Sequence, residues 1–360
     1  MAITASMVKE LREMTGAGMM DCKKALTETD GDMEAAVEAL RKSGAAKMVK
    51  KQSRIAAEGI ARVAVDGNTA VVAEVNSETD FVAKNETFQE FVQTVADTAL
   101  KSGLNGGKNG EDIEALLGID GLNELLVEKT ATIGEKLSVR RFEKVTGDCV
   151  ASYIHGGGKI GVLVAAIGAS DDAAKEALTN VAMQIAAMNP QYISRDEISA
   201  EEMAKIKEIT VDSALNDPAT LPKPILNDLW AKVESGNLFS AEDAAALAEK
   251  KNDKYLFNFL SDAAKATLAG LAMEDKDAIA ANKIFAGLVD GRISKQIKED
   301  TLLEQAYVKA EDGKQPVGKY LESVNKALTI TKFVRFEVGE GMEKKNEDFA
   351  AEVAAQMAGN

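Results

Sequence analysis

The sequence predicts an α+β protein, because helical and strand-like hydrophobic periods alternate along its 360 residues. Three observations support this fold class. Residues 1–44 carry apolar side chains at helical spacing. Two pairs of β-rich runs flank short turns, and an amphipathic helix follows each pair. Finally, a long stretch at about 196–325 is mainly helical in its pattern.

The first 55 residues predict a small three-helix domain. A helix is expected from Thr4, a good N-cap, to the breaker cluster Thr15-Gly16-Ala17-Gly18. A second helix covers Met19–Leu26, and a third follows Gly31, with Gly44 as its predicted stop. Such a domain is too small to bury much apolar surface, so we expect it to pack on another part of the protein or to bind a partner molecule.

The core that follows is predicted to be duplicated. One β-hairpin turns at Asp66-Gly67-Asn68, and a second turns at the glycine-rich tip His155-Gly156-Gly157-Gly158-Lys159. A flexible loop is expected at 102–110. Each half ends in a return strand that contains Arg-Phe-Glu, at 141–143 and at 335–337. This repeat predicts two similar subdomains with helices packed on antiparallel sheets.

These patterns divide the chain into five expected parts. The parts are an N-terminal domain 1–55, a first core subdomain 56–146, a second core subdomain 147–195 with 326–341, an inserted helical arm 196–325, and a C-terminal module 342–360. Two interpretations of the arm remain open from the residues alone. It could make interactions, or it could form an extra packed helical layer.

Composition excludes several function classes. A net charge of −15 argues against direct nucleic-acid binding by the whole chain. The two cysteines, Cys22 and Cys149, and the single histidine, His155, cannot build a disulfide framework or a multi-histidine metal site. No nucleophile–base pair, metal-ligand spacing or cofactor loop is evident, so we expect neither an enzyme nor a cofactor. No apolar run approaches the roughly 20 residues of a membrane helix, and a cytoplasmic location is expected.

One local exception to the acidic balance is a basic run. Six cations and no acid occur between Arg41 and Arg54. The run could be a solvated helix or linker, or a functional basic patch. Near it in sequence, Met19 and Met20 are consecutive, so they cannot both face one core. At least one is expected at the surface, where methionine suits an adaptable contact.

The run Thr79-Asp80-Phe81-Val82 is the most informative candidate for binding. It places a carboxylate beside a large aromatic side chain where the strand Ala70–Val75 ends. In the commoner case Phe81 would be a core anchor and Asp80 a turn or cap residue. The matching place after the second hairpin, Ala169–Asp172, carries no aromatic residue. That difference favours a role for Phe81 outside the fold, as a contact for another protein.

Several long motifs resemble those of the elongation factor Ts family. The resembling segments are the N-terminal signature Thr15–Leu26, the core motif Thr79–Lys84, the second hairpin His155–Val164, and the C-terminal stretches Phe333–Gly341 and Asp348–Ala354. The resemblance covers about 1–210 and 283–360. It implies a guanine-nucleotide exchange factor for elongation factor Tu, the GTPase that carries aminoacyl-tRNA to the ribosome.

The resemblance also implies roles for particular residues. The N-terminal domain would have a ubiquitin-associated-like fold and would dock on the partner's nucleotide-binding domain through Met19, Met20 and Lys23. The run Thr79-Asp80-Phe81-Val82 would then dislocate the Mg²⁺ in the partner's nucleotide site, with Phe81 as a wedge between partner helices.

Three further positions match partner contacts of the family. Ile133 and Gly134 correspond to contacts near the partner's nucleotide site, and His155 to a histidine that meets another part of the partner. The implied assembly is a complex with elongation factor Tu, as a heterodimer or larger, and a homodimer is compatible with the family.

The chain departs from the family in the helical arm, where 212–280, with the single tryptophan Trp230, looks like extra sequence. In the family this region is a short coiled-coil-like dimerisation hairpin. An alternative function is a scaffold or chaperone-like binding module that does not promote nucleotide exchange.

Overall fold

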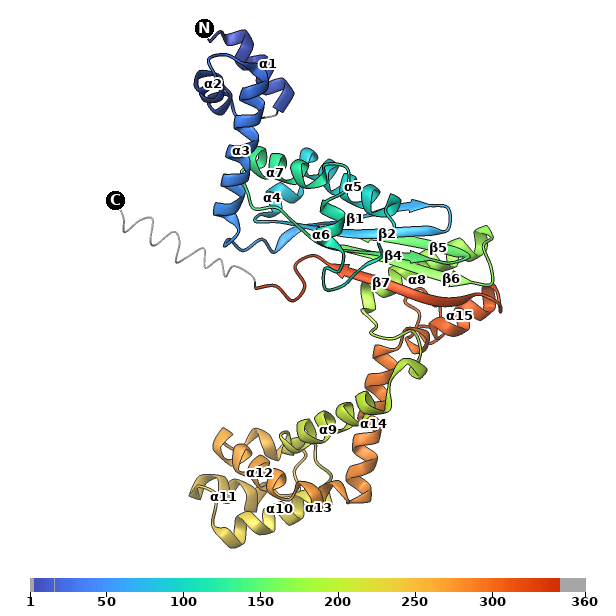
Figure 1. Ribbon diagram of the computed structural model, residues 1–360. Helices are drawn as coiled ribbons and strands as arrows, with labels where there is room; N and C mark the ends of the chain where they lie inside the picture. The colour runs from blue at the N-terminus through green and yellow to red at the C-terminus, as the bar shows by residue number, and fades with distance from the viewer. Residues whose placement is uncertain (1–2, 16, 344–360) are drawn as a thin grey trace. The chain divides into compact units, whose positions relative to one another are not determined.

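The computed structural model describes residues 3–15 and 17–343. The chain forms two compact units, which are described separately: Met1–Asn189 with Tyr307–Asn360, and Pro190–Ala306 (Figure 1). Helices and two small antiparallel sheets are both present, so the predicted α+β class is confirmed. The expected C-terminal module falls, from residue 344 onward, outside the described residues.

The first unit begins with three helices, α1 (Ala5–Thr15), α2 (Met19–Glu28) and α3 (Met33–Lys51). The hydroxyl of Thr4 accepts a hydrogen bond from the backbone N–H of Met7, as expected of a helix N-cap. Leu11, Cys22 and Leu26 are fully buried and form the centre of a small apolar core. The three helices therefore begin where the hydrophobic pattern predicts them.

The predicted end of α3 at Gly44 is wrong, because the helix continues to Lys51. Gly44 is buried against helix α7 (Leu122–Ile133). A Cβ atom at this position would lie 3.4 Å from side-chain atoms of both Val127 and Ala131. The glycine thus allows α3 and α7 to approach closely, and it does not stop the helix.

The first sheet has the strand order β1-β2-β4-β3 and is antiparallel. Its strands are β1 (Glu58–Asp66), β2 (Thr69–Ser77), β3 (Gly106–Gly107) and β4 (Ser138–Thr146). The first predicted hairpin is confirmed, since Asp66 pairs with Thr69 across a two-residue turn. The expectation of a flexible loop over the whole of 102–110 is wrong in one place, because Gly106 and Gly107 form strand β3 and pair with β4.

Helices cover one face of this sheet. They are α4 (Asp80–Ala83), α5 (Glu86–Lys101), α6 (Ile113–Leu117) and α7. The α5 side chains Phe88, Phe91 and Val95 are buried against apolar residues of β1 and β2. Their spacing of three or four residues places them on one face of the helix.

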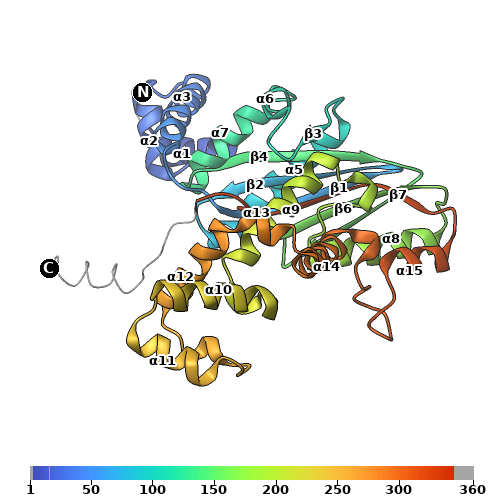
Figure 2. The same cartoon turned by 90° about the horizontal axis from the view of Figure 1, so that it is seen from below.

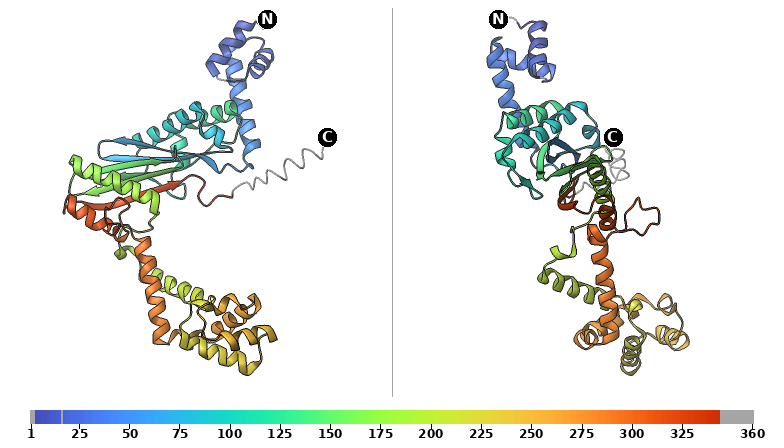
Figure 3. Two further views of the ribbon diagram at one scale, coloured as in Figure 1. Left: turned by 180° about the vertical axis from the view of Figure 1, so that it is seen from behind. Right: turned by 90° about the vertical axis from the view of Figure 1, so that its right-hand side faces the viewer.

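The second sheet repeats this order of elements. Strands β5 (Cys149–His155) and β6 (Ile160–Ile167) form a hairpin, and β7 (Thr329–Glu337) returns beside β6. Helix α8 (Asp172–Met188) covers this sheet, and α15 (Val317–Val324) packs on α8. Apolar side chains from both sheets share one cluster, so the layers run helix, sheet, sheet, helix (Figure 3).

The second unit is entirely helical in its regular structure. Its α-helices are α9 (Ala200–Leu215), α10 (Lys223–Gly236), α11 (Ala241–Lys250), α12 (Asp262–Glu274), α13 (Lys276–Ala280) and α14 (Lys283–Asp300) (Figure 2). They enclose a single apolar cluster that includes Trp230 and Phe285. The capping signal at Ser240 is confirmed, since its hydroxyl accepts from the Asp243 N–H. In the described part of the chain, no helix has the length and apolarity needed to span a membrane.

Candidate functional site

The candidate site is built where the chain leaves the first sheet. Strand β2 ends at Ser77, and the single helical turn α4 begins at Asp80. Thr79 has extended backbone angles, and its hydroxyl accepts from the Val82 N–H at 3.4 Å. Threonine is a favoured N-cap, and a carboxylate in the first turn complements the helix dipole. The structure therefore places the cap at Thr79 and not at Asp80, which the sequence suggests as a turn or cap residue.

Phe81 projects into solvent from this turn. The residue is 80% exposed, the highest value among the large exposed hydrophobic residues of the described chain. The common interpretation of Phe81 as a core anchor is therefore wrong, and the expectation that it faces outward is confirmed. Its neighbours anchor the turn, since Ala83 is buried and Val82 packs against the core of the first sheet.

Asp80 lies beside Phe81 and carries a local partner. Its carboxylate forms an ion pair of 2.7 Å with the ammonium group of Lys84, one helical turn further on. The hydrogen bond from Lys84 lowers the pKa of Asp80, so this carboxyl group is ionised at neutral pH. The Lys84 ammonium also lies 5.9 Å from the centre of the Phe81 ring. The turn thus presents an apolar ring next to a charged pair.

Ile133 and Gly134 lie at the end of α7, next to the Thr79 turn in the fold. Gly134 has φ +86° and caps the helix with its N–H bonded to the Thr130 carbonyl. This left-handed conformation, which favours glycine, turns the chain so that Glu135 faces the Thr79 turn.

The carboxylate of Glu135 accepts hydrogen bonds from Thr79 Oγ1, at 2.6 Å, and from the N–H groups of Glu78 and Thr79, both at 3.0 Å. Glu135 is not predicted from the sequence. Its partners lie 56 and 57 residues away in the chain, and no local spacing links them.

His155 lies at the tip of the second hairpin, which approaches the same end of the first sheet. The carbonyl of Gly158 accepts from the Ala61 N–H of β1 at 2.7 Å. The tip is a hairpin turn with three glycines at positive φ, as the sequence predicts. His155 is exposed, and its Nδ1 lies 3.1 Å from the hydroxyl of Tyr153.

The tip also brings a positive charge toward Asp80. Lys159 forms an ion pair with Glu58, and Glu58 lies directly opposite Ser77 in the β1–β2 register. The charge of Lys159 contributes to lowering the pKa of Asp80. The His155 tip and the Thr79 turn therefore share one end of the sheet.

Met19, Met20 and Lys23 lie on α2, in the N-terminal helices. Both methionines are exposed, by 58% and 75%, and Lys23 is exposed as well. Cys22 and Leu26 occupy the opposite, buried face of the same helix. The expectation of at least one surface methionine is confirmed.

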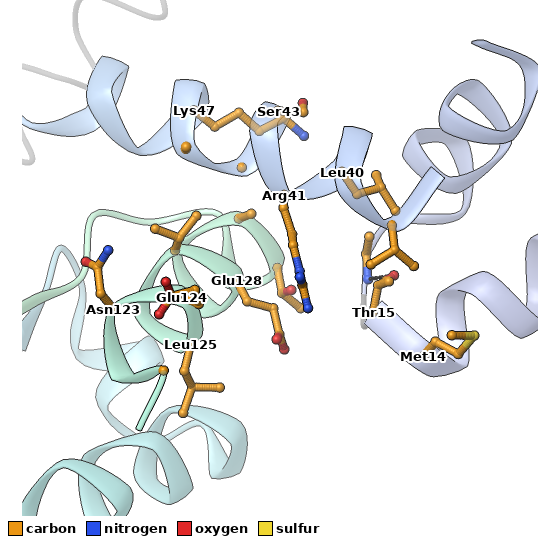
Figure 4. A pocket seen from close by; sticks show the side chains of 18 of the residues that line it. Met14, Thr15, Leu40, Arg41, Ser43, Lys47, Asn123, Glu124, Leu125 and Glu128 are labelled. Atoms are coloured by element: carbon orange, nitrogen blue, oxygen red, sulfur yellow. Dashed lines mark hydrogen bonds between the residues drawn. The ribbon is translucent and has the colours of Figure 1, made fainter. Parts of the chain in front are cut away.

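A cavity of about 640 Å³ lies between the N-terminal helices and α7 (Figure 4). Its walls include Leu40 and Arg41 of α3 and Leu125 of α7. Lys47 forms an ion pair of 2.8 Å with Asp21 at this cavity. Figure 4 shows Arg41 pointing into the space.

The basic run Arg41–Arg54 is partly neutralised. Lys42 pairs with Glu38, Lys47 with Asp21, and Arg54 with Glu78. These pairs favour the interpretation of the run as a solvated helix. In residues 3–15 and 17–343, no group of three His, Cys, Asp or Glu side chains is arranged to hold a metal ion.

Comparison with known proteins gives two findings. A family profile described as "Elongation factor TS" matches residues 78–340. Elongation factor Ts of Clostridioides difficile (strain 630) is 43% identical over 366 residues, which cover 99% of this chain and 99% of that protein. This alignment also spans the second unit, so residues 212–280 are not extra sequence relative to that protein, and the expectation of an insertion is wrong for this comparison.

Proposed function

The chain belongs to the elongation factor Ts family and has the role of a translation elongation factor, and we propose that it is the guanine-nucleotide exchange factor of elongation factor Tu. In this proposal it binds the GDP form of elongation factor Tu and promotes replacement of GDP by GTP. The observation that carries the proposal is the exposed Phe81 beside Asp80, on a capped turn fixed to the sheet end.

The proposed mechanism is displacement of Mg²⁺ in the partner. The Phe81 ring inserts between elements of elongation factor Tu, and the shift dislocates the Mg²⁺ that bridges GDP and protein. Mg²⁺ neutralises much of the diphosphate charge, so its loss leaves the phosphates poorly compensated and weakens GDP binding. The coupling is reciprocal, and GDP therefore weakens the binding of this chain to the same degree. Refilling of the site by GTP then releases the factor.

The other predicted residues receive supporting roles in the proposal. Ile133 and Gly134 contact the partner near its nucleotide site, and the His155 tip contacts another part of it. Met19, Met20 and Lys23 dock the N-terminal domain, which we propose to be ubiquitin-associated-like. No catalytic group, cofactor or metal of this chain takes part.

We further propose a cytoplasmic location and a complex with elongation factor Tu as the working assembly, a heterodimer or larger, with a homodimer as a further state. The similar order of elements in the two sheets supports an internal duplication.

A double substitution tests the exchange function. Asp80→Ala with Phe81→Ala removes the exposed ring and its carboxylate while leaving the buried Ala83 and the Thr79 cap in place. We expect the stimulated release of labelled GDP from elongation factor Tu to fall at least about tenfold, as for a central contact residue. Fluorescence of the labelled nucleotide measures the rate.

The matched control is Val65→Ala with Asp66→Ala. This pair also combines an exposed apolar side chain with an acid, at the opposite end of the β1–β2 hairpin. Its release rate should equal that of the unchanged chain. A folded Asp80→Ala/Phe81→Ala variant with full activity would rule out the wedge mechanism.

The exposed Met19 and Met20 also favour a second candidate, a scaffold or chaperone-like binding module. That function predicts binding to elongation factor Tu that is insensitive to GDP. Competition between GDP and this chain for elongation factor Tu excludes it as the main role.

A further inference from the structure

The carboxylate of Glu135 accepts three hydrogen bonds from the Thr79 turn. The chain leaves β2 with the N–H groups of Glu78 and Thr79 pointing away from the sheet ladder, and both donate to Oε2 of Glu135 at 3.0 Å. The Thr79 hydroxyl donates to the other oxygen, Oε1, at 2.6 Å. Hydrogen bonds to an ionised acceptor are stronger than neutral ones.

The Thr79 hydroxyl acts in two directions. Its single O–H group donates a hydrogen bond to Glu135. Its lone pairs then face the Val82 N–H, which the hydroxyl caps at 3.4 Å. Glu135 therefore orients the group that begins the helical turn carrying Asp80 and Phe81.

A second carboxylate returns the contact. Oε1 of Glu78 accepts from the Lys136 N–H at 2.6 Å and from Arg54 Nη1 at 3.2 Å. The Lys136 ammonium donates to the backbone carbonyls of Gln52 and Arg54. The two contacts are therefore reciprocal. Glu135 accepts from the backbone of Glu78 and Thr79, and Glu78 accepts from the backbone of Lys136, the residue after Glu135.

We propose that Glu135 is a positioning residue that holds the Thr79-Asp80-Phe81-Val82 turn in a fixed place against the Ile133-Gly134 corner. The proposal rests on the proposed exchange function and names a residue that the motif itself does not contain. Through Glu135, the exposed ring and the α7 corner meet the partner as one rigid surface.

Rigidity matters because Phe81 has to move part of its partner. A ring on a loose turn yields when it meets resistance, and the turn must be ordered at the moment of binding. Ordering consumes part of the interaction free energy, which is then not available to displace the partner's elements. Because three hydrogen bonds to Glu135 already order the turn, less of that free energy is lost on binding.

The first test is the rate of GDP release at saturating concentrations of the factor. Glu135→Ala should lower the maximal stimulated rate about tenfold, the effect expected from losing charged hydrogen bonds that order a contact. Glu135→Gln should give an intermediate rate, since its amide oxygen accepts while its NH₂ group faces a donor. Glu128→Ala is the control: this exposed carboxylate of α7 lines the cavity in Figure 4 and pairs with Lys129, and its removal should leave the rate of the unchanged chain.

The second test uses the free chain and needs no partner. Amide hydrogen exchange at Glu78 and Thr79 should accelerate in Glu135→Ala and stay unchanged in Glu128→Ala, because only the first removes their acceptor. Thr79→Val removes the hydroxyl with little change of shape. Its effect on GDP release should be strongly non-additive with Glu135→Ala if both act through one hydrogen bond.

The outcomes separate this proposal from the one on which it rests. If the unchanged chain fails to accelerate GDP release, the exchange function falls, and the positioning role in exchange falls with it. If the unchanged chain is active and folded Glu135→Ala and Glu135→Gln are equally active, only the positioning role falls. Amide exchange at Glu78 and Thr79 that is no faster in Glu135→Ala than in the unchanged chain would also overturn it.

Discussion

The exposed position of Phe81 depends on what its neighbours do. A one-turn helix has too few internal hydrogen bonds to persist alone, since helix nucleation is unfavourable. Thr79 caps it, Ala83 is buried beneath it, and Glu135 fixes its entry. The ring can therefore remain in water without the turn collapsing onto the sheet.

Gly134 offers a prediction at the residue scale. Its φ of +86° is costly for any residue with a side chain, yet a Cβ would meet nothing within 4 Å. Gly134→Ala should therefore lower the free energy of unfolding by about 1 kcal/mol, through backbone strain alone. Relief of that strain would move Glu135, so stimulated GDP release should fall as well. Urea unfolding and nucleotide release measure the two effects.

The control for this prediction is Gly67→Ala. Gly67 has φ +55° and equally open surroundings, but it lies at the β1–β2 turn. Its loss of stability should be similar and its GDP release unchanged. Equal loss of release in both variants would show that general destabilisation, not the position of Glu135, causes the effect.

At this scale the sequence predicts Phe81 but not Glu135. An aromatic residue at a strand end, absent from the second half of a duplicated pattern, indicates an outward role. The bonds of Glu135 join residues 56 and 57 positions apart, and they exist only once the corner after α7 has folded against the end of β2. No local pattern in the sequence marks that contact.

At the scale of elements, a buried carboxylate joins the two sheets. Glu74 of β2 is fully buried, and its oxygens lie 2.5 Å from Arg141 Nε and 2.9 Å from Arg140 Nη1. It also accepts from the Gly339 N–H, just beyond β7, and the Arg141 guanidinium lies 4.2 Å from the Phe336 ring centre. The Arg-Phe-Glu echo of the two return strands thus has a packing role.

Glu74→Ala should therefore destabilise the first unit strongly. It leaves Arg141, which is 5% exposed, without its main counter-charge. Removing one partner of a buried ion pair costs about 3–5 kcal/mol. Urea unfolding followed by circular dichroism measures the change.

Glu143→Ala is the matched control. Glu143 pairs with Lys332 and also joins β4 to β7, but the lysine is 46% exposed. Its loss should cost less than about 1 kcal/mol. Similar losses for the two variants would contradict the importance of burial.

Elements with local signals are predicted well, and those that depend on distant packing are not. The Asp66-Gly67-Asn68 turn and the glycine tip after His155 specify their hairpins through turn chemistry. The end of α3 is mispredicted because Gly44 resembles a stop, whereas its role is to let α7 approach. Strand β3 is missed because only Gly106 and Gly107 pair.

At the scale of the whole molecule, the helical unit Pro190–Ala306 has a core of its own. The sequence predicts a helical arm here but places its end near 325. Residues 307–325 instead belong to the first unit, where Tyr307 stacks on Tyr320 at 4.1 Å and Tyr320 receives a hydrogen bond from Asn180 of α8. Those contacts join distant residues, so no local pattern indicates them.

The last prediction is that this helical unit is dispensable for nucleotide exchange. The residues proposed to contact the partner, from Met19 to His155, all belong to the first unit. Deletion of 212–280 should therefore leave stimulated GDP release close to that of the full chain. Because this deletion removes Trp230 from a shared core and uncovers Phe285 on α14, a second variant replaces all of 190–306 by a short Gly-Ser linker. Adding Asp80→Ala and Phe81→Ala to each deletion should abolish its activity. Loss of GDP release in both deletions, with the first unit folded by circular dichroism, would assign the helical unit a direct part in exchange.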